Sequence, residues 1–468
     1  MALPAPAGAV PPIKHVFILV LENKGFHETF GNDSKAPYLS KTLTGQGQLI
    51  ANYYGTTHLS LGNYIAMTSG QASNPQTQSD CQIFSEFFPG TIGADGQALG
   101  SGCVYPQAVH TIANQLEAKG LTWKGYMEDM GNSATDPKTC RHPDVNSQDH
   151  TQSAEVGDQY AARHNPFVYF HALIDFPTCA QNDVPLDRLH ADLASVSTTA
   201  NYSFITPNLC NDGHDAPCVD GKPGGLEGAN EFLKAWVPRI LASPAYKQDG
   251  LLLVTFDEAE VETSPPSGDA SACCNQPPGP NTPNPGGPII GPGGGLVGMV
   301  ALSPWVRGGS INATPYNHYA MLRSIEDIFG LGHLGYAGQA GLRAFGDDVF
   351  NGPGPGGNHS GGGGGGSTAC SERTLPKPKK GKFSRGTLIL SAKKTRRGAR
   401  TRLEMRFSHR ASVLISADPS GRRRGPRRIG PTSVIACKTY RTTLPRGSGW
   451  VAINAIAGGG TELRRLHY

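Results

Sequence analysis

The sequence predicts an α/β protein whose central, mostly parallel sheet carries helices on both faces, followed by a small C-terminal all-β module. Two short apolar runs, His15–Leu21 (HVFILVL) and Gly250–Phe256 (GLLLVTF), are typical of strands buried on both faces of a parallel sheet. An amphipathic pattern over Gly225–Ala242 predicts a long helix that packs on such a sheet. Short alternating segments near the C-terminus predict the all-β module.

Apolar periodicity places the other elements along the chain. Residues 73–102 and 271–295 are expected to be irregular, the second because Pro and Gly recur in it. Further strands are expected at residues 47–53, 121–127, 202–206 and 297–302, further helices at residues 36–43, 61–68, 111–119, 186–193 and 317–329, and strands of the module at residues 387–391, 402–407, 411–416, 433–439 and 450–456.

The charge is divided unevenly between two bodies. Residues 371–468 carry 24 Lys and Arg against 4 Asp and Glu, a net charge of +20, which leaves 17 basic and 33 acidic residues, a net charge of −16, in residues 1–370. Residues 351–370 include a run of six glycines and are predicted to be a flexible linker. We therefore expect a first domain at residues 1–350 and a basic all-β module at residues 371–468.

The basic module invites an anionic partner, either a nucleic acid or an anionic surface such as a lipid or cell wall. No aromatic ladder or recognition helix accompanies the charge. A solubilising or wall-binding role is therefore an equal alternative to nucleic-acid binding.

Ten cysteines at irregular spacing predict disulfides rather than a structural zinc site, and hence a secreted or extracellular protein. The adjacent Cys273 and Cys274 are expected to bond to different partners. No apolar run is long enough to predict a membrane span. The first residues lack the pattern of a secretory signal peptide, so we expect a mature or trimmed start.

Polar pairs follow the two strongest predicted strands. Glu22 and Asn23 come directly after the first, and Asp257 and Glu258 come directly after the second. Ligands of open α/β sheets bind at the carboxyl ends of the strands, so the two pairs can converge there. Convergent carboxylates are costly without a cation, and their oxygens suit a divalent one. The sequence therefore predicts a divalent metal site of unknown identity.

Ser60 and Asn63 lie one turn apart at the start of a predicted helix. Unpaired backbone N–H groups at a helix N-terminus favour an anion, so Ser60 is a candidate nucleophile for attack on phosphorus. A serine at this position is also the ordinary residue for a helix cap, and this stretch alone leaves both interpretations open.

Two histidines are further candidates. His214 has Asp212 and Asp215 on either side after a predicted strand, and it could protonate a leaving alkoxide. His318 follows Asn317 at another helix start, where an ordinary cap is the alternative. His164 is a weaker candidate for phosphate contact, and the Glu128-Asp129 pair is a weaker candidate for the surroundings of the site.

Five ordered stretches resemble the bacterial phosphoesterase family that contains acid phosphatases and phosphatidylcholine-type phospholipases C, which has the alkaline phosphatase-like fold. The resemblance spans roughly residues 15–335 and leaves out the basic tail. The matching stretches are HVFILVLENKGFHETFG from His15, THLSLGNYIAMTSG from Thr57, ITPNLCNDGHD from Ile205, LLLVTFDE from Leu251 and NHYAMLRSIEDIFGL from Asn317.

The resemblance implies roles for particular residues of this chain. Glu22, Asn23, Asp257 and Glu258 would hold a divalent cation, and Ser60 would bridge to it as the nucleophile. Asn63 would touch a phosphoryl oxygen, and His214 and His318 would be leaving-group acids or phosphate contacts.

We therefore expect a secreted, metal-dependent phosphoesterase, most simply an acid phosphatase-type phosphomonoesterase that acts on a phosphate ester through a phosphoserine intermediate. A phospholipase C acting on phospholipid or phosphoinositide headgroup diesters is the alternative within the enzyme class. An alternative of another class is a degenerate fold that binds anionic surfaces through the basic module.

Overall fold

A computed structural model gives the fold of two compact units, Met1–His359 and Ser360–Tyr468, which are described separately. The structure describes residues 10–352 and 354 of the first unit. In the second unit it describes residues 389–397, 400–407, 411–419, 427–428, 433–434, 439–444, 449–457 and 460–467. The glycine-rich stretch predicted as a linker lies almost wholly outside the described residues.

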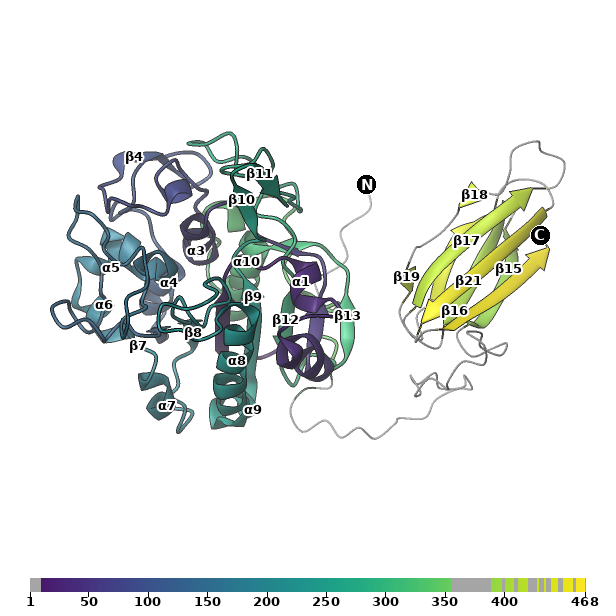
Figure 1. Ribbon diagram of the computed structural model, residues 1–468, viewed down its shortest axis with the longest axis horizontal. Helices are drawn as coiled ribbons and strands as arrows, with labels where there is room; N and C mark the ends of the chain where they lie inside the picture. Colours follow the sequence, from purple (N-terminus) through teal and green to yellow (C-terminus); the bar gives the residue numbers. More distant parts are fainter. Residues whose placement is uncertain are drawn as a thin grey trace. The chain divides into compact units, whose positions relative to one another are not determined.

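The first unit is built on an eight-stranded sheet (Figure 1). Every neighbouring pair in it is parallel except the two pairs made by β12, which runs antiparallel to both β9 and β2. The prediction of a mostly parallel sheet is confirmed. In spatial order the strands are β13 (Ser310–Asn312), β2 (Gln48–Ile50), β12 (Met299–Leu302), β9 (Gly250–Phe256), β1 (His15–Leu21), β8 (Tyr202–Thr206), β6 (Trp123–Met127) and β7 (Asp183–Pro185).

Strand β1 lies between β9 and β8 in the interior of the sheet. All seven of its residues are buried, and so are all seven of β9. Successive side chains of a strand point to opposite faces, so both faces of the sheet are covered here. The two strands pair in register from His15 opposite Gly250 to Leu21 opposite Phe256, which brings the residues after each strand side by side.

The covering helices form two packed groups. One group contains α8 (Gly225–Ala242), α9 (Pro244–Asp249) and a π-helix at Tyr38–Leu43, and the other contains α3 (Ser60–Ser69), α4 (Ile112–Ala118) and α10 (His318–Phe329). The amphipathic face of α8 buries Phe232, Leu233 and Ile240. Helix α10 is capped by the Asn317 side chain, which accepts a hydrogen bond from the Ala320 N–H at 3.0 Å.

Shorter elements complete the first unit. They are α1 (Phe26–Phe30), α2 (Thr44–Gln46), α5 (His171–Ile174), α6 (Pro177–Asn182), α7 (Arg188–Asp192), 3₁₀ turns at Thr77–Ser79, Ala162–His164, Pro166–Tyr169 and Gly335–Gly338, and the paired strands β3 (Tyr53–Tyr54) with β14 (Tyr316–Asn317), β4 (Phe88–Ile92) with β5 (Ala98–Ser101), and β10 (Val261–Thr263) with β11 (Pro266–Gly268).

Two of these hairpins were not predicted from the sequence. The β4–β5 hairpin lies inside residues 73–102, which were expected to be irregular. Pro89, Gly90 and Gly100 interrupt the alternation that would have predicted strands there. The β10–β11 hairpin is only three residues long on each side, too short to give a pattern.

The eight cysteines of the first unit pair with one another. Three disulfides join Cys81 to Cys103, Cys140 to Cys179, and Cys210 to Cys218. The expectation that Cys273 and Cys274 bond to different partners is wrong, because they are bonded to each other. The other six cysteines of this unit are already paired, so neither had a second partner within it. Cys370 and Cys437 lie outside the described residues.

The described residues of the second unit lie almost entirely in strands, as predicted. Strands β15 (Ile389–Arg397), β16 (Arg400–Phe407) and β20 (Thr439–Thr443) form one antiparallel sheet. The other sheet contains β17 (Ala411–Pro419), β18 (Arg427–Arg428), β19 (Ser433–Val434), β21 (Gly449–Ala457) and β22 (Gly460–His467).

Across the part of the chain that the structure describes, no helix combines the length and apolar character needed to cross a membrane.

We predict that Phe17→Ala lowers the free energy of unfolding by about 3–5 kcal/mol, because Phe17 is fully buried in β1 and its loss leaves a cavity. The matched control is Phe88→Ala, since the Phe88 side chain is 79% exposed, and it should change the free energy by less than about 0.5 kcal/mol. Urea unfolding of both variants measures the difference. Equal losses would contradict the placement of β1 in the core.

Candidate functional site

Ser60 lies at the first position of α3 and is 4% exposed. Its hydroxyl donates a hydrogen bond of 2.8 Å to Glu22 Oε2, at the carboxyl end of β1. Leu59 occupies the N-cap position of α3, and its side chain makes no capping hydrogen bond. The Ser60 hydroxyl therefore bonds to a carboxylate of another element, and the cap interpretation of this serine is not what the structure shows.

Asn23 links the ends of β1 and β9. Its φ of 51° is left-handed, a conformation that Asn tolerates better than most residues. In this conformation its N–H donates to Asp257 Oδ1 at 3.0 Å, and its side-chain Nδ2 donates to Glu22 Oε2 at 2.8 Å. The same Nδ2 lies 3.4 Å from Ser60 Oγ. Glu22, Asn23, Ser60 and Asp257 are thus joined in one hydrogen-bonded cluster.

Glu22 is buried and makes contacts through both of its oxygens. Tyr64, one turn after Ser60, donates from its hydroxyl to Glu22 Oε1 at 2.7 Å. His164 Nε2 lies 3.2 Å from the same oxygen without hydrogen-bonding geometry, and its ring stacks on Tyr64. Burial raises the pKa of Glu22, and the hydrogen bonds from Tyr64 and Ser60 partly oppose that rise.

The Asp257-Glu258 pair is buried too. Burial, followed by the charges of Glu22 and Glu258, raises the pKa of Asp257 well above its usual range, and burial does the same for Glu258. His58 Nδ1 contacts Glu258 Oε2. Burial lowers the pKa of His58 to about 4, so its imidazole is neutral at neutral pH.

His318, the first residue of α10, contacts the main chain of this pair. Its Nε2 donates to the Asp257 carbonyl at 2.5 Å, and its Nδ1 accepts from the Tyr53 hydroxyl at 2.9 Å. Burial lowers the pKa of His318 to about 4. Both ring nitrogens of this neutral histidine are therefore occupied by protein groups.

The chemistry of the cluster suits a hard divalent cation. Asp257 Oδ2 and Glu258 Oε1 are buried oxygens without a hydrogen-bond partner, which is a costly state for carboxylates. A cation would relieve it, and carboxylate and amide oxygens are appropriate ligands. The residues that could hold such an ion are Glu22, Asn23, Asp257 and Glu258, with the Ser60 hydroxyl beside them.

The carboxylates of Glu22, Asp257 and Glu258 are not gathered as tightly as a bound ion requires. Within the described residues, three ligand atoms lie within 4.8 Å of one another only in clusters that include the Cys140–Cys179 or Cys210–Cys218 disulfide, whose sulfurs are already bonded. Simultaneous coordination by the three carboxylates therefore requires side-chain movement, such as release of Glu258 from His58.

Asn63 faces the loop before Ser60. Its Oδ1 accepts from the Thr56 N–H at 2.8 Å and from the Thr57 N–H at 3.1 Å, and its Nδ2 donates to the Thr57 carbonyl at 2.9 Å. These bonds fix the loop that leads to Ser60. Its predicted contact with a phosphoryl oxygen stays a prediction.

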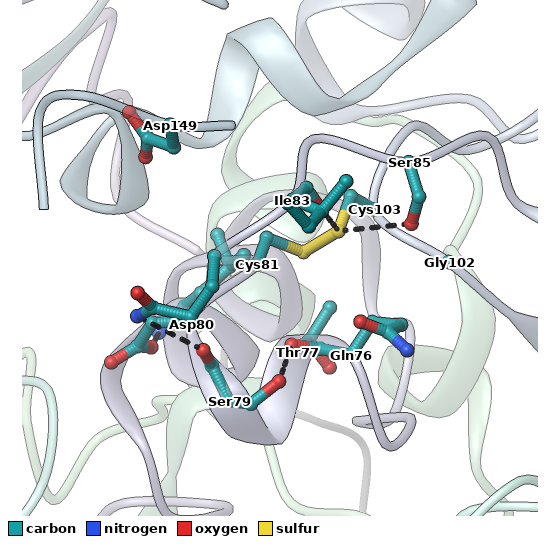
Figure 2. The surroundings of a disulfide bond; sticks show 12 residues. Gln76, Thr77, Ser79, Asp80, Cys81, Ile83, Ser85, Gly102, Cys103 and Asp149 are labelled. Carbon is teal, nitrogen blue, oxygen red and sulfur yellow. Dashed lines mark hydrogen bonds between the residues drawn. A yellow bond between two sulfur atoms is a disulfide. The ribbon is translucent and has the colours of Figure 1, made fainter. Parts of the chain in front are cut away.

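Asp80 supplies the cap that α3 lacks locally. Its Oδ1 accepts from the Leu61 N–H at 2.9 Å, so a carboxylate already occupies one of the amides expected to be free. Figure 2 shows Asp80 next to Cys81, whose disulfide to Cys103 fixes this segment. Burial raises the pKa of Asp80.

His214 lies at the edge of the cluster, with a side chain that is 51% exposed. Its Nδ1 pairs with Asp215 at 2.8 Å, and this hydrogen bond raises the pKa of His214. Its N–H donates to Asp212 Oδ1, and the Asp212 carbonyl accepts from the Glu22 N–H at 2.9 Å. The segment that carries His214 is therefore fixed to the end of β1.

Glu128 and Asp129, at the end of β6, accept hydrogen bonds from the loop after β8, which is the segment that carries His214. Asn208 donates from its N–H to Glu128 and from its Nδ2 to Asp129, and Asn211 donates to both oxygens of Glu128. These carboxylates hold the loop after β8 rather than facing Ser60.

Sequence reasoning did not identify Tyr64, Asp80 or Arg163 as parts of this site. Tyr64 is one turn from Ser60, so the helical spacing was a usable signal. Asp80 directly follows one short 3₁₀ turn and Arg163 lies in another, and no local pattern marks either residue.

The sequence of this chain is similar to that of a known protein family. The profile of the phosphoesterase family matches residues 33–332, well over half of the chain. Ser60, His214, Asp257 and His318 lie inside the matched range, and Glu22 and Asn23 lie just before it.

Two similar relatives differ in how much of them this chain spans. A probable acid phosphatase of Kluyveromyces lactis is 25% identical over 69% of this chain and 59% of its own length. A phosphatidylinositol-3-phosphatase of Mycobacterium tuberculosis is 26% identical over 71% of this chain and 83% of its own length. The chain thus spans less than two thirds of the first relative.

A solved structure in the alkaline phosphatase superfamily, from Vibrio parahaemolyticus, covers 70% of this chain and 68% of its own at 12% identity, with a TM-score of 0.39. That score is too low to carry an argument.

We predict that Asp80→Ala lowers the free energy of unfolding by about 0.5–2 kcal/mol, because it removes the acceptor of the Leu61 N–H. Asp80→Asn keeps an acceptor of the same shape and should lose less. Urea unfolding at pH 7 compares them. An equal loss in both variants would show that Asp80 stabilises α3 through its charge and not as a cap.

Proposed function

The chain belongs to the phosphoesterase family, and from this premise we propose that it is a metal-dependent phosphomonoesterase of the acid phosphatase type with Ser60 as its nucleophile. The observation that carries the proposal is the 2.8 Å hydrogen bond from Ser60 Oγ to Glu22 in a buried cluster of carboxylates. A hydroxyl whose proton points at a carboxylate can lose that proton as it attacks phosphorus.

The first step forms a bond between Ser60 Oγ and phosphorus and breaks the bond between phosphorus and the ester oxygen. The hydroxyl proton passes to Glu22 Oε2, its hydrogen-bond partner. Asn23, bonded to both Glu22 and Asp257, fixes the orientation of the accepting carboxylate.

The leaving oxygen needs a proton, and His214 is the proposed donor. Its partner Asp215 raises the pKa of His214, which keeps the imidazole protonated under mildly acidic conditions. Its half-exposed position lets leaving groups of different sizes reach it. Water then attacks the phosphoserine and gives a proton to His214, and the phosphorus–Oγ bond breaks as Glu22 returns its proton to Oγ, which releases phosphate and restores the Ser60 hydroxyl.

Glu22, Asn23, Asp257 and Glu258 are the proposed metal ligands. A divalent cation bound by them would lower the pKa of the Ser60 hydroxyl and neutralise charge on the phosphoryl oxygens. The unpartnered buried oxygens of Asp257 and Glu258 support this assignment.

Names of relatives favour a monoester over a diester. The two relatives above are named an acid phosphatase and a phosphatidylinositol-3-phosphatase, and both names denote removal of a terminal phosphate. A phospholipase C activity on headgroup diesters remains the second candidate from the sequence resemblance.

We also propose that the protein works outside the cell, and that its basic module holds it at an anionic surface. Four disulfides in the first unit suit an oxidising compartment. The net charge of +20 on residues 371–468 suits an anionic lipid or wall polymer.

Ser60→Ala should lower kcat for p-nitrophenyl phosphate at least about a thousandfold, since the covalent route is lost. The control is Ser203→Ala, because Ser203 is a buried serine of β8 whose hydroxyl has no hydrogen-bond partner. That variant should keep its activity. Near-normal turnover by folded Ser60→Ala would refute the nucleophile.

Adding a divalent cation to metal-free protein should raise its melting temperature, because a ligand at a hundred times its Kd stabilises the folded state by about 2.7 kcal/mol. Asp257→Asn should abolish the rise. Glu128→Gln, at the end of β6 in the same sheet, should keep it, because Asn208 and Asn211 already occupy that carboxylate. A rise that survives in Asp257→Asn would place the ion elsewhere.

The full chain should bind vesicles containing phosphatidylserine at low salt and release them at high salt, since each Lys or Arg near such a surface contributes about 1 kcal/mol that salt screens. Co-sedimentation measures the bound fraction, and vesicles of phosphatidylcholine alone are the control. Equal binding to both vesicles would contradict an electrostatic role for the module.

A further inference from the structure

The segment at residues 149–164 contacts Asp80 at one end and Glu22 at the other, and these two residues lie on either side of Ser60. At one end, Gln152 Nε2 donates to the Asp80 carbonyl at 2.8 Å, and Asp80 caps the Leu61 N–H beside Ser60. At the other end, the His164 ring lies against Tyr64 and Glu22, the hydrogen-bond partner of Ser60. The side chains of this segment therefore lie beside the cluster around Ser60.

Arg163 is one of these side chains. Its Nη1 donates to the Gln152 carbonyl at 2.9 Å, which anchors one arm of the guanidinium to the same residue that holds Asp80. Its carboxylate neighbours in electrostatic range are Asp80, Glu22, Asp212 and Asp149, in that order of strength. Asp80 and Glu22 are the two carboxylates that contact the first turn of α3, at the Leu61 N–H and the Ser60 hydroxyl, so the guanidinium is in electrostatic range of the groups on both sides of Ser60.

The guanidinium keeps donors to spare. Among the residues that the structure describes, no carboxylate oxygen lies within 4.0 Å of it, and its one hydrogen bond is the Nη1 bond to Gln152. Arg163 is also partly exposed, so a ligand can reach it. Burial by itself would lower the pKa of Arg163, but the surrounding carboxylates outweigh burial and raise it, so the charge is permanent.

A phosphate ester that enters this site meets mostly negative charge. Glu22, Asp212, Asp257 and Glu258 are buried in or beside it, and Asp80 is half-buried. A single divalent cation offsets only part of that charge.

The other nearby bases offset little of it, since the charge of a protonated His214 is paired with Asp215. Burial lowers the pKa of His164 well below its usual range, so that imidazole is neutral. Lys24 follows Asn23 but pairs with Glu28 and Glu260. Among the described residues, Arg163 is thus a permanent cation that is in electrostatic range of the carboxylates around Ser60 and forms no ion pair with any of them.

We propose that Arg163 binds the non-bridging oxygens of the substrate phosphoryl group, and that Gln152 and Asp80 position its guanidinium for this. The proposal rests on the phosphoesterase function proposed above, and it adds a substrate contact contributed by this chain itself. The planar fork of N–H donors matches two phosphate oxygens at once, which an ammonium group does not.

The competing interpretation is that Arg163 only neutralises the carboxylates around it. Both roles predict some loss of stability when the charge is removed. Both also predict weaker binding of inorganic phosphate, the reaction product, and only bidentate phosphate binding predicts that Arg163→Lys, which keeps the charge, weakens it too.

The test uses the full-length, metal-loaded protein and inorganic phosphate as the probe. Arg163→Gln should raise both the Ki for phosphate and the KM for p-nitrophenyl phosphate about tenfold or more, the effect expected when a charge-assisted hydrogen bond is lost. Arg163→Lys keeps the charge without the fork and should give an intermediate Ki.

The matched control is Arg323→Gln. Arg323 Nη1 likewise donates to a main-chain carbonyl, that of Ala337 at 2.8 Å, but this arginine lies on α10 and braces the loop at residues 335–339. Its replacement should leave the Ki for phosphate unchanged.

An unchanged Ki for phosphate in Arg163→Gln, with or without a lower melting temperature, would overturn the proposal. If Arg163→Gln does not fold, a wild-type Ki in Arg163→Lys would overturn it, since the lysine lacks the bidentate fork. Failure of the proposed function is distinguishable, because wild-type protein would then neither turn over p-nitrophenyl phosphate nor bind phosphate in calorimetry.

Discussion

The hydrogen bond between the Ser60 hydroxyl and the Glu22 carboxylate is the interaction on which the account of this site depends. It joins the first turn of α3 to the end of β1, two elements 38 residues apart in the sequence. The bond exists because β1 and β9 run in register and deliver Glu22 and Asp257 side by side, and because Asn23 turns left-handed to bond to both. A serine in this position is committed to a buried carboxylate and is not free to cap its own helix.

Such an arrangement costs stability. Burial raises the pKa values of Glu22, Asp257 and Glu258, so ionising these carboxylates costs free energy. Proteins retain unfavourable groups of this kind mainly at functional sites, where a ligand compensates the cost. Here a divalent cation and the Arg163 guanidinium would compensate it together, the first beside the strand ends and the second across from them.

The amino-acid pattern was sufficient to predict those parts of the fold that depend on local periodicity. Strands β1, β8 and β9 and helix α8 begin and end where their apolar patterns do, and the polar pairs at the strand ends meet as a parallel sheet requires. Asp80 and Arg163 could not be predicted, because they lie in or directly after short 3₁₀ turns without a periodic pattern and long-range contacts place them. The Cys81–Cys103 disulfide is one such contact, and it fixes the segment that carries Asp80.

The most direct test of the central claim is to find the covalent intermediate. Metal-loaded protein mixed with a phosphomonoester and quenched in acid within one turnover should yield a peptide containing Ser60 that carries one added phosphoryl group, as seen by tandem mass spectrometry. The account predicts that this label appears on Ser60 and disappears at longer times. A label on another residue, or turnover with no labelled peptide at any quench time, would contradict it.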